Sequence, residues 1–187
     1  KHQREIYDII AARTLREIQD MSITDQAKLQ KFRVARMIRL LQAASNPTLL
    51  YEMSAEFDVD SQSFSEQFGL HSTGIKLPTI EPDLYEKIIN YSQYEIPSKM
   101  VAAHKLAKKL YDQGKKVIIW SSFIGNMNIF KIQLFKDIDP IIINGDVPRD
   151  TSILGNRDEL INKFKNSKEP QILIATAASL GESVSLH

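Results

Sequence analysis

The last seventeen residues constrain the fold of this chain most, because they run from a strand-like stretch into a loop-like one. Residues 172–175 are apolar and rich in isoleucine, which is typical of a strand buried on both faces. Residues 176–185 then gather hydroxyl side chains, alanines and one glycine. Parallel sheets bind ligands just beyond the carboxyl ends of their strands. The pattern predicts such a sheet with a binding loop over 176–185, and we expect the sheet to continue in a larger protein.

Composition excludes several classes of protein. The chain of 187 residues has no cysteine, which excludes disulfides and thiolate metal sites and fits a cytoplasmic location. A net charge of +1 gives no overall case for nucleic-acid binding, so such a function needs a local surface. No apolar run approaches the roughly 20 residues of a membrane span, so we expect no membrane partner.

The two halves of the chain differ in character, which predicts a helical extension and linker over 1–95 and an α/β domain over 96–187. In the first half, apolar spacing predicts helices at 2–20, at 24–44 with Thr24 as N-cap, and at 81–92. The acidic, serine-rich stretch 52–80 is interpreted as a loop or linker.

In the second half, helices alternate with strands, as in a parallel α/β sheet. The expected helices are 98–113, closed by Gly114, then 124–136 and 156–166, and the expected strands are 116–121, 140–144 and 171–176. Right-handed crossovers between three such strands make half of a doubly wound sheet.

Familiar catalytic motifs are missing from the chain. It has no glycine-rich triphosphate loop ending in Gly-Lys-Ser/Thr and no Gly-x-Ser-x-Gly. The four histidines show no metal-ligand spacing. We therefore expect no catalytic residue and no metal site in this chain alone.

The ends of the predicted strands carry the candidate binding residues. They are Ser121, Ser122 and Phe123 after the first strand, Gly145 and Asp146 after the second, and Thr176 after the third. Hydroxyls and backbone N–H groups at one edge of a sheet suit phosphate oxygens. Any α/β protein, however, places Gly, Ser and Asn at such turns, so the residues alone leave both interpretations open.

The order of these segments resembles that of the Swi/Snf-type superfamily-two ATPases. Residues 98–100 and GKKVIIWSSF (114–123) resemble motif IV, and 172–186 resembles motif V. Three more segments resemble parts of the family: the spacing of Arg157, Ile161 and Phe164 after Asn144-Gly145, the stretch RLLQAASNPTLL (39–50), and Gln3 with Tyr7. Departures are Asn46 where eukaryotic members have His, Leu41 where they have Arg, a longer stretch between Gly145 and Arg157, and LGESVSL (180–186) in motif V.

The resemblance implies a fold and a role. The fold is α/β, a RecA-like parallel sheet with flanking helices, preceded by an α-helical extension or protrusion. The role is the second motor lobe of an ATP-dependent double-stranded DNA translocase. Ser121, Ser122, Phe123, Gly145, Asp146 and Thr176 would bind the DNA backbone, and Gly181 and Glu182 would face the nucleotide cleft.

In the intact protein, ATP and Mg would be held mainly by an N-terminal RecA-like lobe, which is also an expected partner. This chain lacks the P-loop, the Asp-Glu box and motif VI, so by itself it should be an inactive part of an ATP hydrolase. The departures suggest a divergent bacterial member, hence a cytoplasmic, nucleoid-associated location.

Several alternatives stay open. The chain could be the nucleotide-sugar lobe of a glycosyltransferase, although the expected Glu signature is not found, or a non-catalytic protein-interaction module. Phe123 and Trp120 could be core residues, and Arg157 a solvated helix residue or part of a salt bridge. A basic helix stripe comprising Lys28, Lys31, Arg33, Arg36 and Arg39, with Lys99, Lys105, Lys108 and Lys109, could add DNA affinity or be an ordinary solvated surface.

Overall fold

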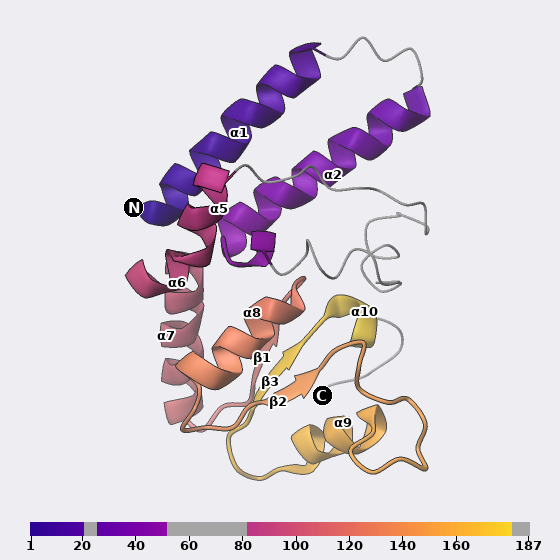
Figure 1. Ribbon diagram of the computed structural model, residues 1–187. Helices are drawn as coiled ribbons and strands as arrows, with labels where there is room; N and C mark the ends of the chain where they lie inside the picture. Colours follow the sequence, from indigo (N-terminus) through magenta and orange to yellow (C-terminus); the bar gives the residue numbers. More distant parts are fainter. Residues whose placement is uncertain (21–25, 52–81, 181–187) are drawn as a thin grey trace. The chain divides into compact units, whose positions relative to one another are not determined.

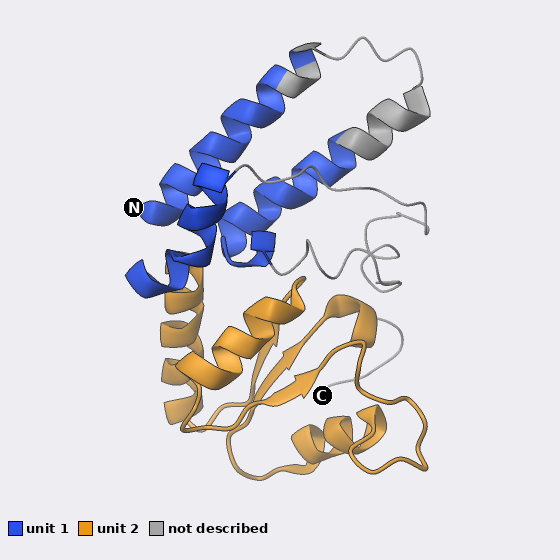
Figure 2. Ribbon diagram, viewed as in Figure 1, with its two compact units in different colours: residues 1–62, 71–97 blue, residues 63–70, 98–187 orange. Residues whose placement is uncertain are grey.

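The computed structural model describes residues 1–20, 26–51 and 82–180, and these form two compact units (Figure 2). Within the described residues, the first unit comprises 1–20, 26–51 and 82–97, and the second comprises 98–180. The predicted N-cap Thr24, the predicted linker 52–80, and Gly181 and Glu182 lie outside the described residues.

The first unit is helical, as predicted. Its helices are α1 (His2–Asp20), α2 (Gln26–Ser45), α5 (Pro82–Ile89) and α6 (Tyr91–Tyr94) (Figure 1). The single helix predicted over 81–92 is wrong in one respect, because the chain turns at Asn90 and begins a second short helix. The core comprises Ile6, Ile10, Ala43, Leu50, Leu84, Ile88 and Tyr91.

Polar side chains join the start of α1 to the end of α2. The Gln3 side-chain amide donates to the carbonyls of Ala43 (3.2 Å) and Ala44 (2.9 Å). Carbonyls in the last turn of a helix have no partner within the helix, so this amide satisfies two of them. Beyond the helix, the buried Asn46 accepts hydrogen bonds from the backbone N–H and the hydroxyl of Thr48. Asn46 thereby stabilises the turn that ends α2.

Arg39 does not belong to a solvated basic stripe, which corrects that part of the prediction. Its side chain is buried, and Nη1 donates to the carbonyl of Leu50 (3.1 Å) and to Oε1 of Gln42 (3.3 Å). Burial, with a smaller contribution from the charge of Arg36, lowers the pKa of Arg39 to about 10. Arg39 therefore holds the chain that follows α2.

The second unit alternates helices and strands in the predicted order. Its elements are α7 (Ser98–Asp112), β1 (Val117–Trp120), α8 (Ile124–Ile129), the π-helical η1 (Phe130–Leu134), β2 (Ile141–Ile143), α9 (Arg157–Asn166), β3 (Ile172–Ala175) and α10 (Ala177–Leu180) (Figure 1). Gly114 ends α7 with a φ of +78°, a conformation that side chains with a Cβ rarely adopt. No helix among the described residues is both long and apolar enough to cross a membrane.

The three strands form a parallel sheet in the order β1-β3-β2. The stretch predicted to be buried on both faces is the central strand, and all four residues of β3 are at most 1% exposed. Its alternate residues point to opposite faces. This arrangement confirms the predicted α/β fold with a parallel sheet and flanking helices.

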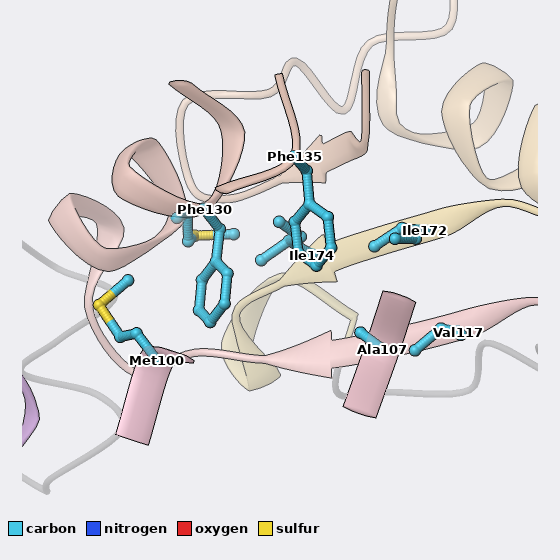
Figure 3. Packing of buried hydrophobic residues seen from close by; sticks show 8 residues of the cluster. Met100, Ala107, Val117, Phe130, Phe135, Ile172 and Ile174 are labelled. Carbon is cyan, nitrogen blue, oxygen red and sulfur yellow. The ribbon is translucent and has the colours of Figure 1, made fainter. Parts of the chain in front are cut away.

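Each face of the sheet has its own core. Ile172 and Ile174 pack with Met100, Ala107, Val117, Met127, Phe130 and Phe135 (Figure 3). On the other face, Leu173 and Ala175 pack with Ile141, Ile143, Ile161, Phe164 and Leu180. The sheet therefore depends on β3 for apolar contacts on both sides.

We expect Leu173→Ala to lower the free energy of unfolding of the second unit by about 2–5 kcal/mol, because it removes a fully buried side chain and leaves a cavity. Urea denaturation followed by the fluorescence of Trp120, the single tryptophan, measures this change. The matched control is Leu154→Ala at a residue that is 90% exposed, which should change it by less than about 0.5 kcal/mol. Equal effects of the two substitutions would contradict the placement of β3.

Candidate functional site

The register of the sheet brings three predicted strand ends into one row. Trp120 and Ile143 are both paired with Ala175, so β1, β3 and β2 end at the same level. Two further backbone hydrogen bonds extend the sheet, from Ser121 N to the carbonyl of Ala175 (2.9 Å) and from Thr176 N to the carbonyl of Ile143 (3.1 Å). The carboxyl edge of the sheet therefore carries Ser121, Thr176 and Asn144 side by side, with Thr176 in the middle.

Thr176 joins the central strand to a short helix. Its buried hydroxyl donates to the hydroxyl of Ser179 (2.7 Å), and its carbonyl accepts a hydrogen bond from Ser179 N (3.1 Å). The prediction of a loop starting at residue 176 is therefore wrong for 177–180, which form α10. Alanine favours helix, and the local bonds of Thr176 begin the turn, so small residues here make a helix rather than a loop.

Ser121 forms the turn after β1 with its own hydroxyl, which donates to the carbonyl of Phe123 (2.8 Å) and accepts from Phe123 N (3.3 Å). Ser122 is exposed. Phe123 is buried, as the core alternative predicts. The same alternative is wrong for Trp120, which is 53% exposed. Trp120 is the last residue of β1, and among the described strands β1 has a neighbour on one side only.

The turn after β2 is organised by Asn144, whose side chain is buried. Its Oδ1 accepts from Asp146 N (3.2 Å), and its Nδ2 donates to a carboxylate oxygen of Asp146 (3.1 Å). Gly145 and Asp146 are both exposed at this turn. Since a carboxylate repels phosphate and the Asp146 N–H already has a partner, Asp146 contributes to the shape of the turn.

Arg157 is neither a solvated helix residue nor part of a salt bridge among the described residues, so both of those expectations are wrong. Its Nη2 donates at 3.4 Å to the carbonyls of Asn144 and Val147, and its backbone N–H donates to the carbonyl of Pro148 (2.8 Å). The guanidinium folds over the turn, where these two carbonyls accept its hydrogen bonds. Burial lowers the pKa of Arg157, with a smaller contribution from the positive charge of Arg149.

The sequence analysis did not single out Arg149. Its charge acts on Arg157, so two guanidinium groups lie near the turn after β2. The longer stretch between Gly145 and Arg157 was the available signal, because it contains Arg149.

The start of α9 is a reciprocal cap: Glu159 N donates to Asn156 Oδ1 (3.0 Å), and Gly155 N donates to a Glu159 carboxylate oxygen (2.7 Å).

The first unit has a cavity of about 530 Å³ between the start of α1 and the helices α5 and α6. The ring of His2 stacks on that of Tyr94 at 4.6 Å, and Lys87 forms an ion pair with Glu5. The hydrogen bond from Lys87 is the main reason that the pKa of Glu5 is lowered. Within the described residues, no cluster of His, Asp and Glu could hold a metal ion.

The Thr176–Ser179 contact should be a measurable unit of stability. We expect Thr176→Val and Ser179→Ala each to lower the free energy of unfolding by about 1 kcal/mol. Each substitution removes one hydroxyl of the pair and leaves the other hydroxyl buried without its partner. The double variant should fall short of the sum by about 1 kcal/mol in a double-mutant cycle. Ser122→Ala at an exposed neighbour is the control. Additive single effects would contradict the contact.

Comparisons with known proteins place this fold. No protein-family model and no curated protein matches the sequence. The solved Sulfolobus solfataricus SWI2/SNF2 ATPase C-terminal domain is similar over 98% of this chain, with a TM-score of 0.60 and 15% identity. The C-terminal part of the Fun30 ATPase domain is similar over 100% of it, with a TM-score of 0.56 and 21% identity.

The chain spans 62% and 68% of the lengths of these two structures. Neither likeness supports the expected bacterial origin. Both likenesses extend over the helical part of this chain as well as over the sheet, because they cover 98% and 100% of it. This chain therefore has the RecA-like fold of the C-terminal domain of SWI2/SNF2 ATPases.

Proposed function

We propose that this chain is the second motor lobe of an ATP-dependent double-stranded DNA translocase. It would bind the DNA backbone and close on ATP and Mg held mainly by an N-terminal RecA-like lobe of the intact protein. The similarity in fold to two ATPase C-terminal domains supports this role. Gly181 and Glu182, which lie outside the described residues, would face the nucleotide cleft in this proposal, and the predicted nucleoid-associated cytoplasmic location belongs to it as well.

The observation that carries the proposal is the row of Ser121, Thr176 and Asn144 along the carboxyl edge of the sheet. The Asn144 amide has a second N–H for a phosphate. The hydroxyls of Ser121 and Thr176, which donate to the Phe123 carbonyl and the Ser179 hydroxyl, would rotate to donate to phosphate without a fixed positive charge. Such contacts position a protein on the duplex and do not read bases. A motor that moves along any sequence needs contacts of this kind.

The anchoring of this edge in the buried sheet suits a lobe that must hold DNA while it moves. The row follows β3, whose residues are buried on both faces, and Arg157 holds the turn after β2 through two carbonyls. When the two lobes close on ATP, the edge would move as one body with the sheet. Closure of the two lobes would thus displace the DNA backbone bound at this edge.

The first experiment measures ATP hydrolysis by the intact protein without nucleic acid, and with duplex DNA, single-stranded DNA or duplex RNA. We expect duplex DNA to stimulate turnover. Ser121→Ala should reduce the stimulated rate by about tenfold, corresponding to about 1.4 kcal/mol of lost transition-state stabilisation. Absence of stimulation by any nucleic acid would contradict the proposal and favour the protein-interaction module.

Ser167→Ala is a closely matched control. Ser167 makes the same two local bonds as Ser121, because its hydroxyl donates to the carbonyl of Glu169 (3.0 Å) and accepts from Glu169 N (3.1 Å). It lies before β3, at the amino edge of the sheet. Its substitution should leave the stimulated rate unchanged, and an equal loss in both variants would show a loss of stability instead of a lost DNA contact.

A further inference from the structure

Two of the three segments at the amino edge of the sheet carry an excess of positive charge that the proposed function does not use. The third, which leads into β2, has Lys136 with Asp137 and Asp139. Residues 113–117, which lead into β1, and 163–171, which lead into β3, contain a single carboxylate, Glu169. The same segments contain five lysines, which we call the lysine edge: Lys115, Lys116, Lys163, Lys165 and Lys168.

The fold brings these lysines together. Lys116 Nζ donates to the carbonyl of Lys165 (2.6 Å) and lies 5.7 Å from the centre of the Phe164 ring. Val117 N donates to the carbonyl of Gln171 (2.8 Å), which joins the starts of β1 and β3. Since α9 runs back against the strands, its last turn, with Lys163 and Lys165, reaches the same edge (Figure 1).

These charges have no carboxylate partners in the part of the chain that the structure describes. Elsewhere in the described residues, Lys87 pairs with Glu5, Lys108 with Asp112, and Lys131 with Asp139. Among the described residues, no ion pair involves a lysine of the lysine edge, and four of the five are exposed, Lys165 being half-buried. Like charges held on fixed elements repel one another, and a polyanion would relieve that repulsion.

We propose that the lysine edge is a second nucleic-acid-binding surface, which binds the phosphate backbone of a duplex segment by charge alone. Lysine is depleted in protein–protein interfaces, which are anchored by aromatic and apolar side chains. In both segments, which the structure describes throughout, the large apolar side chains Val117 and Phe164 are buried. A duplex fits this composition better than an acidic protein.

This surface is separate from the proposed site at the carboxyl edge. The two edges are the opposite ends of strands up to four residues long, about 13 Å at 3.3 Å per residue, and they face opposite directions. A straight duplex that lies across one row of strand ends has the sheet between it and the other row. The lysine edge therefore binds a different segment, and the inference does not depend on the motor activity.

The test measures the affinity of the chain for duplex DNA of random sequence over a series of salt concentrations. The variant is Lys115→Gln with Lys163→Gln and Lys168→Gln, which leaves the structural contacts of Lys116 and Lys165 in place. The slope of log K against log salt should become shallower by about 0.9 for each lost phosphate contact, and so by about 2.7 for all three. The thermal unfolding midpoint of the variant should match that of the wild type.

The matched control removes the same charge from the exposed lysines of α7, as Lys99→Gln with Lys105→Gln and Lys109→Gln. For this control variant, we expect the slope of log K against log salt to stay within about one unit of the wild-type slope. An unchanged slope in the lysine-edge variant, or an equal change in the control, would overturn the proposal. Binding of polyglutamate, which stands for an acidic protein, is measured in parallel. If the lysine-edge variant loses polyglutamate binding but keeps duplex binding, the proposal is overturned in favour of an acidic protein partner.

If the triple variant does not fold, Lys115→Gln and Lys168→Gln as single substitutions each still predict a change of about 0.9 in the slope. These results are independent of ATP hydrolysis. Failure of the motor proposal would appear as a missing ATPase response in the intact protein, whereas failure of this inference would appear only in the salt dependence.

Discussion

Burial of β3 on both faces is the constraint on which the second unit depends. Its four residues are at most 1% exposed and supply side chains to two separate cores. A strand in that position must be hydrogen-bonded on both edges, because buried backbone groups without partners are costly. Its pairing with β1 and β2 then brings their carboxyl ends level, which places Ser121, Thr176 and Asn144 in one row. The geometry of the candidate site is therefore a consequence of core packing.

The two ends of this sheet differ in chemistry. At the carboxyl end, hydroxyls and an amide dominate, and the charges of Arg149 and Arg157 have Asp146 and Asp150 in the same segment. At the amino end, the segments that lead into β1 and β3 have five lysines and one carboxylate, whereas the segment before β2 has Lys136 with Asp137 and Asp139. Hydrogen-bond donors without net charge give position, whereas clustered lysines give salt-dependent affinity. A motor lobe built this way would separate the contacts that direct movement from the contacts that retain the nucleic acid.

Most elements could be predicted from local patterns. The isoleucine-rich runs of 141–143 and 172–175 predict buried strands, and Gly114 predicts the end of α7, which the structure confirms with a φ of +78°. The predictions that were wrong concern side-chain environment. Arg39 has the sequence of a surface cation but is buried against the carbonyl of Leu50, and Trp120 is apolar but exposed. The backbone carbonyl decides the environment of Arg39, and the position of β1 at the edge of the described sheet decides that of Trp120; periodicity reveals neither.

The sequence by itself determined that this protein has a helical part followed by a parallel α/β sheet, because apolar periodicity and glycine positions act over a few residues. It also determined which residues stand at the strand ends. Only the tertiary structure decided that β3 is central, that Arg157 binds the turn after β2, and that lysines from 113–117 and 163–171 share one edge. These features depend on contacts between residues distant in the sequence, 10 and 13 residues apart for Arg157 and 49 for Lys116 and Lys165. Such contacts are chosen by packing and by the pairing of buried polar groups.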